Sequence, residues 1–172
     1  MESIGLTNKY VKSLCFKLIP KQFIDTIPCN WLMHYIDLMK TRIMNGDSFG
    51  IIVNLSPDTH SGSHYIALSY NNGKLSFFDS LLLQYEDPNI TAVVEYLLKN
   101  VPFIQFCMSK KRIQDISSVM CGFHCISFLL SQHKTNPVVL EEYEDYFYDN
   151  DLLRNDEISK KFIVEYINDY TR

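Results

Sequence analysis

The hydrophobic pattern of the first third of the chain predicts a helix followed by a buried strand. Apolar residues recur at helical spacing after Asn30, a candidate N-cap, and stop at Asn45-Gly46, a pair typical of helix ends. Residues 49–55 (FGIIVNL) are apolar and rich in β-branched side chains, which indicates a buried strand. The composition of residues 56–63 predicts a loop.

A β-hairpin is the clearest local prediction. Two apolar runs, 64–70 and 74–79, flank Asn72-Gly73, the strongest short signal for a two-residue hairpin turn. In that register position 64 faces position 81, so position 79 is the diagonal neighbour of position 64 on the same face. Diagonal neighbours lie about 7–8 Å apart at the backbone, within joint reach of an imidazole and a carboxylate. We therefore expect the hairpin to bring His64 and Asp79 together.

The second half of the chain is predicted to be mainly helical. Asp87-Pro88 is typical of a cap and first helical residue, and residues 103–107 predict another strand. The apolar positions after Cys121 are too continuous for a surface helix and indicate a buried helix that begins at this residue. Residues 138–170 predict two further helices with a break near 149–151. The expected fold class is α+β, with a mixed or antiparallel central sheet flanked by helices.

Length and composition are those of one globular domain. The 172 residues are expected to form a single domain, 1–172, and contents of 47% hydrophobic and 13% aromatic residues are typical of a compact protein. No stretch reaches the roughly eighteen consecutive apolar residues of a membrane span, and the N-terminus lacks the pattern of a signal peptide. The five cysteines, an odd number, predict free thiols in a reducing, intracellular compartment.

The charge pattern adds little functional information. A net charge of −4 disfavours general affinity for nucleic acids, which depends on clustered Lys and Arg. The tight basic cluster at 110–112 is expected to lie in a solvated loop. The acidic residues within 141–145 are expected to face solvent from one side of a helix.

Four residues could together form a thiol hydrolase site. A nucleophilic cysteine needs a base to form the thiolate, a carboxylate to orient that base and a donor to hold the oxyanion. The chain supplies these groups in the order His64, Asp79, Gln114 and Cys121, and the last two have the spacing Gln-x6-Cys-Gly. A helix that begins at Cys121 would favour its thiolate and leave its N–H free for an oxyanion.

Packing or metal binding is the alternative for each of these residues considered alone. Buried cysteines are common, and the combination of four groups, not any single one, favours catalysis. Cys121, His124 and Cys125 share one helix face and are possible zinc ligands, but three ligands in one turn without a second Cys/His pair is not the usual spacing. We therefore expect no metal site. The remaining histidines and cysteines are expected to be structural or exposed.

The set of motifs resembles the adenovirus-type maturation proteases (adenain) and their relatives, the SUMO-deconjugating SENP-type proteases. The resemblance covers roughly residues 49–130, with a fainter match in 16–25, and implies a papain-like architecture. It assigns the base, the orienting acid, the oxyanion donor and the nucleophile to His64, Asp79, Gln114 and Cys121. The sequence departs from these families at Tyr65, where Trp is usual, and at 123–125, where Phe-His-Cys replaces Phe-Cys.

The resemblance also implies a function. A short chain of this kind is expected to be a virus-encoded cysteine endopeptidase that matures capsid or core precursors at Gly-containing sites. Tyr65 could form an aromatic wall of the substrate cleft that admits only glycine at the scissile bond. No cofactor is expected apart from an activating peptide or DNA; adenain-type enzymes bind that peptide through a cysteine upstream of the glutamine, and Cys107 lies in this region. The enzyme would act as a monomer on protein substrates in the host nucleus, the cytoplasm or the virion.

Three other functions remain open. A deconjugase for ubiquitin or a ubiquitin-like protein would use the same triad. A YopJ-like acetyltransferase also uses His, an acid and Cys, and it would depend on acetyl-CoA. An inactive relative or binding module would have no thiol of raised reactivity.

Overall fold

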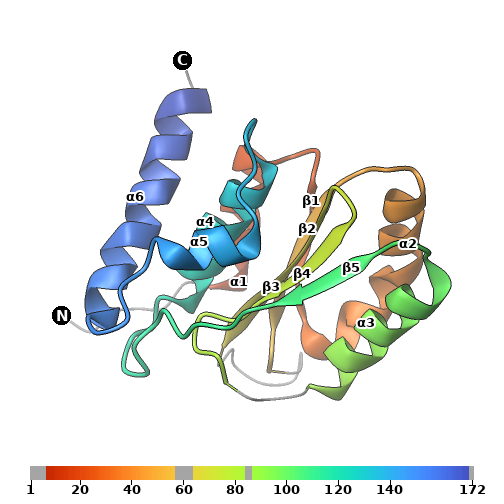
Figure 1. The fold of residues 1–172 in the computed structure, drawn as a ribbon, viewed down its shortest axis with the longest axis horizontal. Coiled ribbons are helices and arrows are strands. Elements are labelled where there is room, and N and C mark those ends of the chain that lie inside the picture. The colour runs from red at the N-terminus through yellow and green to blue at the C-terminus, as the bar shows by residue number, and fades with distance from the viewer. Residues whose placement is uncertain (1–6, 57–63, 84–86, 171–172) are drawn as a thin grey trace.

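A mixed five-stranded sheet forms the centre of the protein (Figure 1). The computed structural model describes residues 7–56, 64–83 and 87–170, so the predicted loop at 56–63 lies almost entirely outside the described residues. The spatial order is β1-β2-β3-β4-β5; β3 pairs antiparallel with β2 and β4, whereas β1 and β5 pair parallel at the edges. The strands are β1 (Phe23–Pro28), β2 (Phe49–Asn54), β3 (Tyr65–Asn71), β4 (Lys74–Phe78) and β5 (Gln105–Met108).

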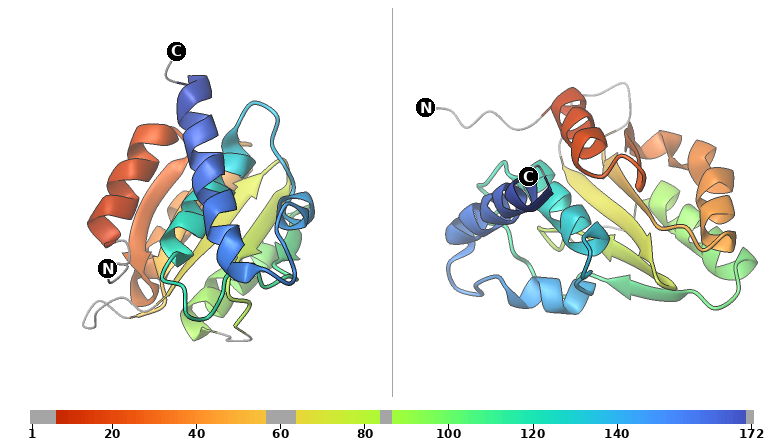
Figure 2. Two further views of the ribbon diagram at one scale, coloured as in Figure 1. Left: turned by 90° about the vertical axis from the view of Figure 1, so that its left-hand side faces the viewer. Right: turned by 90° about the horizontal axis from the view of Figure 1, so that it is seen from above.

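Helices cover both faces of this sheet (Figure 2). The 3-10 helix η1, α2 and α3 pack on one face; α1 and α4 pack on the other, and α5 and α6 contact α4. The α+β fold class expected from the sequence is therefore confirmed. The helices are η1 (Cys29–Tyr35), α1 (Asn8–Leu18), α2 (Ile36–Met44), α3 (Pro88–Asn100), α4 (Cys121–His133), α5 (Leu140–Asp145) and α6 (Leu152–Tyr170).

The apolar run of β2 is explained by burial on both faces of the sheet. Every residue of β2 is buried. Ile52 belongs to the core on the α4 side, whereas Ile51 and Val53 belong to the core on the α3 side. Successive side chains of a strand point to opposite faces, so a strand covered on both sides is apolar throughout. The predicted strand at 49–55 is confirmed.

The predicted hairpin and its register are confirmed. Asn72 and Gly73 both have positive φ, 47° and 79°, as a two-residue type I′ turn requires. Asn71 pairs with Lys74 and Ala67 pairs with Phe78, which is the register that places positions 64 and 79 diagonally.

Two other element predictions needed correction. The segment after Pro28 begins as a 3-10 helix at Cys29 and becomes α-helical only at Ile36, so Asn30 is not the N-cap of an α-helix. Pro28, which precedes this turn, has extended backbone and provides no side-chain cap. The strand predicted at 103–107 begins at Gln105, because Phe103 has a φ of 63° and interrupts the extended backbone.

The helix boundaries of the second half were largely predicted. Asp87 caps α3 by accepting the N–H groups of Asn89 and Ile90 at 2.8 and 3.2 Å. Helix α4 begins at Cys121, as expected, and a break separates α5 from α6. None of the helices in the described part of the chain has the length and apolar character needed to cross a bilayer.

Each of the two charged clusters contains one residue that is more buried than expected. The Glu144 carboxylate is buried and accepts the backbone N–H of Lys110 at 3.1 Å, and burial raises its pKa. Lys111 donates to the carbonyl of Phe147 at 2.6 Å and pairs with Asp149 at 2.9 Å. The predictions of a solvated loop and a solvent-facing acidic side are therefore wrong at Lys111 and Glu144, whose hydrogen bonds join α5 and the turn after it to the segment that follows β5. The other charged residues of the two clusters are exposed, as predicted: Lys110, Arg112, Glu141, Glu142 and Asp145.

Candidate active site

The hairpin brings His64 and Asp79 into direct contact. His64 lies immediately before β3 and Asp79 immediately after β4. His64 Nε2 lies 2.7 Å from Asp79 Oδ1, and the two residues are only 5% and 2% exposed. The same carboxylate oxygen accepts the Leu81 N–H at 3.0 Å, and the Asp79 N–H donates to Ser109 Oγ at 3.0 Å. These bonds fix the carboxylate, so the imidazole is held in one orientation.

The other ring nitrogen of His64, Nδ1, is left free, and the Cys121 side chain lies nearby. Nδ1 is buried and has no hydrogen-bond partner among the described residues. Burial disfavours the charged imidazole, but the hydrogen bond to Asp79, the neighbouring Cys121 side chain and the negative charge of both residues outweigh it and raise the pKa of His64 to about 9. An imidazole with one nitrogen on a carboxylate and the other beside a thiol can take up the thiol proton.

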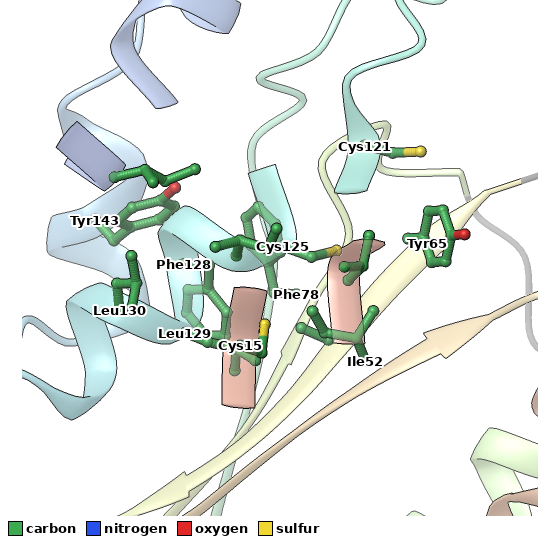
Figure 3. Packing of buried hydrophobic residues seen from close by; sticks show 14 of the residues in the cluster. Cys15, Ile52, Tyr65, Phe78, Cys121, Cys125, Phe128, Leu129, Leu130 and Tyr143 are labelled. Atoms are coloured by element: carbon green, nitrogen blue, oxygen red, sulfur yellow. The ribbon is translucent and has the colours of Figure 1, made fainter. Parts of the chain in front are cut away.

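Cys121 occupies the first position of α4. Figure 3 shows it at the start of this helix, near the ring of Tyr65, while Cys125 lies one turn deeper in the core. The first N–H groups of a helix have no intrahelical partners, so the Cys121 N–H can donate to a bound oxyanion. The helix N-terminus also favours negative charge on the sulfur.

Gln114 is held in the segment that leads into α4. Its side chain is 1% exposed. Gln114 Oε1 accepts from Ser80 Oγ at 2.6 Å, and Nε2 donates to the Ser118 carbonyl at 2.8 Å. The second Nε2 hydrogen makes no hydrogen bond to the described residues and remains available. Ser80 follows Asp79, so the end of the hairpin fixes both the carboxylate and the glutamine.

Sequence reasoning missed Ser80. The signal was its position next to Asp79, but its partner Gln114 lies 34 residues further along the chain. Only the fold brings the two together. The structure therefore joins His64 and Asp79 directly, places Cys121 near enough to raise the pKa of His64, and ties Gln114 to the same strand end.

Tyr65 lies beside Cys121 but faces the core. It is buried within the cluster that contains Cys121, and its hydroxyl donates to Asn8 Oδ1 on α1. Burial and the charge of Cys121 raise the pKa of Tyr65 to about 12. A contact of this ring with substrate stays a prediction.

The other histidines have different surroundings. His124 is buried, and its two ring nitrogens bond Asp156 at 2.9 Å and Ser159 at 2.6 Å. His133 lies 3.2 Å from Ser69 Oγ, and burial lowers its pKa to about 4. His34 is exposed, and His60 lies outside the described residues.

The cysteines have no disulfide partners and form no metal cluster within the described ranges. All five are free thiols. Burial raises the pKa of Cys15 and of Cys125, which disfavours their thiolates. In the part of the chain that the structure describes, no group of three or more His, Cys, Asp or Glu side chains could hold a metal ion.

The architecture is similar to that of several solved structures. The Chlamydia trachomatis effector protein Cdu1, bound to ubiquitin, matches with a TM-score of 0.63 and 15% identity over 95% of this chain and 93% of that one. ChlaDub1 from Chlamydia trachomatis matches with a TM-score of 0.62 and 14% identity over 96% of this chain and 91% of that one. AvrA, solved with IP6 and CoA, matches with a TM-score of 0.53 and 15% identity over 92% of this chain and 68% of that one.

The TM-scores show a shared fold, and identities of 14–15% support no conclusion beyond the fold. The papain-like cysteine protease fold expected from the sequence is therefore confirmed. No protein-family model matches the sequence, and a search of curated proteins finds no match.

Proposed function

We propose that this protein is a cysteine hydrolase that removes ubiquitin or a ubiquitin-like protein from its conjugates. The observation that carries the proposal is the position of His64, with Nε2 2.7 Å from Asp79 and Nδ1 left for Cys121 at the start of α4. The fold supports ubiquitin-like proteins as the substrate class. Cdu1, a structure with the same architecture, was solved bound to ubiquitin, and the match covers 93% of that chain.

The proposed reaction is acyl transfer through a thioester. His64 takes the proton of Cys121, and the thiolate attacks the carbonyl carbon of the terminal residue of the ubiquitin-like protein. The Cys121 N–H and the free Nε2 hydrogen of Gln114 hold the oxyanion. The carbon–nitrogen bond then breaks as His64 protonates the leaving amine. Water, activated by the same imidazole, attacks the thioester and releases Cys121.

The substrate class differs from the one first expected. Cleavage of viral capsid or core precursors rested on the resemblance to adenain, and the similar structures give no support to it. A deconjugase was the alternative from the start, since the same triad serves both reactions. The ubiquitin-bound neighbour favours that alternative.

The test is hydrolysis of fluorogenic amides at the C-termini of ubiquitin, SUMO and related proteins. We expect at least one to be cleaved, with labelling of Cys121 by the matching electrophilic probe. Cys121→Ala should abolish both signals, whereas Cys107→Ala, which removes a half-buried thiol on β5, should keep them. Labelling of Cys107 instead of Cys121 would contradict the proposal.

An acetyl transfer reaction is the informative negative outcome. AvrA was solved with CoA, so the amide assays are accompanied by acetyl-CoA and a protein acceptor. Acetylation that depends on Cys121, without hydrolysis of any ubiquitin-like amide, would reject the proposed hydrolase in favour of an acetyltransferase. Absence of both activities, with a Cys121 no more reactive than Cys107, would indicate a binding module.

A further inference from the structure

A second buried histidine–aspartate pair lies directly behind the candidate active site. His124, one turn after Cys121 on α4, bonds Asp156 through Nε2 at 2.9 Å and Ser159 through Nδ1 at 2.6 Å. The order Asp, His, Ser is that of a serine hydrolase triad with the two ring nitrogens exchanged, and His124 and Ser159 are 0% exposed. Because both ring nitrogens of His124 are already bonded, the imidazole has no free nitrogen for a substrate, and we infer that the cluster acts within the protein.

Asp156 connects this cluster to the segment that carries Gln114. Its Oδ1 accepts from His124, and its Oδ2 accepts from the Ser118 hydroxyl at 2.8 Å. Ser118 uses its carbonyl to accept the Gln114 amide at 2.8 Å and its hydroxyl oxygen to accept the Met120 N–H at 3.2 Å. Ser118 therefore links the Asp156 carboxylate to the Gln114 amide and to Met120, the N-cap residue of α4.

The neighbouring residue of α6 holds the other end of the same segment. Asn155 Nδ2 donates to the carbonyl of Ile113 at 2.9 Å, and the Asn155 side chain is fully buried. Helix α6 thus holds residues 113–120 at both ends. Burying a polar side chain costs free energy unless it is hydrogen-bonded, so each of these bonds favours one position of the segment.

The orientation of the Gln114 amide depends on this segment. Ser80 fixes Oε1 at 2.6 Å, and the Ser118 carbonyl takes one Nε2 hydrogen at 2.8 Å. The direction of the second hydrogen is set by these two bonds, since the amide is planar. If Ser118 moves, the direction of the remaining donor changes with it.

We propose that Asp156 is a positioning residue for the oxyanion site, acting through Ser118 on the amide of Gln114. The inference rests on the proposed function, because it takes Gln114 as an oxyanion donor. Asp156 touches no substrate. It holds the donor where charge develops in the transition state, which is where a preformed hydrogen bond accelerates a reaction.

The test is a double-mutant cycle between Ser118 and Gln114. Asp156→Ala would leave the buried His124 N–H unpaired and endanger folding, so Ser118→Ala is the variant of choice. We expect Ser118→Ala to lower kcat by about 10- to 100-fold, the scale of a small misplacement, without a change in KM. In the Gln114→Ala background it should have no further effect, since the group on which it acts is gone.

Two matched variants control for folding. Ser117→Ala removes the neighbouring hydroxyl, which donates to Asp115 Oδ1 at 2.6 Å and does not touch Asp156. It should leave kcat unchanged. Ser118→Thr restores the hydroxyl and should recover kcat. Equal losses from Ser118→Ala in the presence and absence of Gln114, or a loss that Thr does not recover, would overturn the positioning role.

A small ester separates this inference from the proposed function. Hydrolysis of p-nitrophenyl acetate requires the thiolate and the oxyanion donors but no recognition of a protein. A chain that cleaves this ester through Cys121 but no ubiquitin-like amide contradicts the proposed function, while the cycle measured on the ester still tests Asp156. A chain that cleaves neither substrate overturns both.

Discussion

Two buried histidine–aspartate pairs in this protein differ at one ring nitrogen. In each, Nε2 bonds a carboxylate, at 2.7 Å for His64 and 2.9 Å for His124. Nδ1 of His124 also has a partner, the Ser159 hydroxyl at 2.6 Å. Nδ1 of His64 is buried without a hydrogen bond to the described residues and is left to the Cys121 thiol.

This difference at Nδ1 indicates a structural role for His124 and is consistent with the catalytic role proposed for His64. A buried polar atom without a partner costs free energy. Among the described residues, His133 Nδ1 and Thr26 Oγ1 are also buried without a partner, so the thiol near its free nitrogen is what distinguishes His64. His124 has both nitrogens bonded and supports the packing of α4 on α6. His64 keeps one nitrogen free near the thiol that loses its proton in the proposed reaction. The hairpin register predicts the first pair from the sequence, whereas His124 and Asp156 are 32 residues apart and no local motif connects them.

Replacing His64 or His124 by glutamine should give the largest difference in effect between the two pairs. Glutamine Nε2 can replace histidine Nε2 as a donor, but nothing replaces Nδ1. His64→Gln should stay folded, since Asp79 keeps a donor, and should lose turnover on the order of 10⁶-fold, as removal of the base of a triad does. His124→Gln leaves the Ser159 hydroxyl unpaired and should lower the free energy of unfolding by about 1–3 kcal/mol.

The measurements are single-turnover kinetics and urea denaturation of both variants. The folded His124→Gln protein should remain active, slowed by no more than about 100-fold through a shift of α4. Comparable losses of turnover in the two variants would mean that the free nitrogen of His64 has no special role.

Asp79→Asn should be damaging but less complete than loss of the base. The amide oxygen can stay on the Leu81 N–H, which bonds Oδ1 at 3.0 Å, and can still accept from His64. The charge that stabilises the imidazolium is lost. We expect kcat to fall by no more than about 10⁴-fold, the loss found where such an amide imposes the wrong tautomer. Single-turnover rates equal to those of the wild type would assign the orienting role to another carboxylate.

Gln114→Ala should act in the transition state. Removal of one oxyanion donor lowers kcat by about 10²–10³-fold, and KM should change little. Steady-state kinetics on a ubiquitin-like amide provides both constants. A raised KM with an unchanged kcat would make Gln114 a substrate-binding residue.

The pH dependence of stability and of the reaction rate tests the charge of His64. Its pKa is raised from 6.5 to about 9, so the contribution of its charge to stability is complete below pH 6.5 and is lost as the pH rises through 9. The free energy of unfolding of the wild type, relative to His64→Gln, should fall by up to about 3 kcal/mol across this window. The rate should also fall above about pH 9, because a neutral imidazole cannot protonate the leaving amine. A stability difference that does not change between pH 6 and 10 would contradict the ion pair.

The parts of the fold that were predicted correctly depend on local interactions. Asn72 and Gly73 fix the hairpin because both adopt positive φ, and the register then follows. Asp87 caps α3 within three residues of its own position. The boundaries that were wrong lie where a nearby residue changes the backbone, as Phe103 does before β5.

The part of the site that lies on the hairpin, His64 and Asp79, was predicted from the sequence. Register alone places Asp79 beside His64, and the Gln-x6-Cys spacing places Gln114 on the segment before α4. The hydrogen bonds that hold the glutamine, from Ser80 and to Ser118, needed the assembled fold.

The sequence by itself determined the hairpin, the start of α4 and the identity of the four groups that are proposed to perform acyl transfer. The tertiary structure decided which buried histidine has a free nitrogen near a thiol. His124 is separated from Asp156 and Ser159 by 32 and 35 residues, and these bonds exist only because α6 packs on α4. Local backbone preferences act over a few residues and are visible in the sequence. Whether a buried polar atom finds a partner depends on which distant elements lie against it, and that is a property of the folded chain.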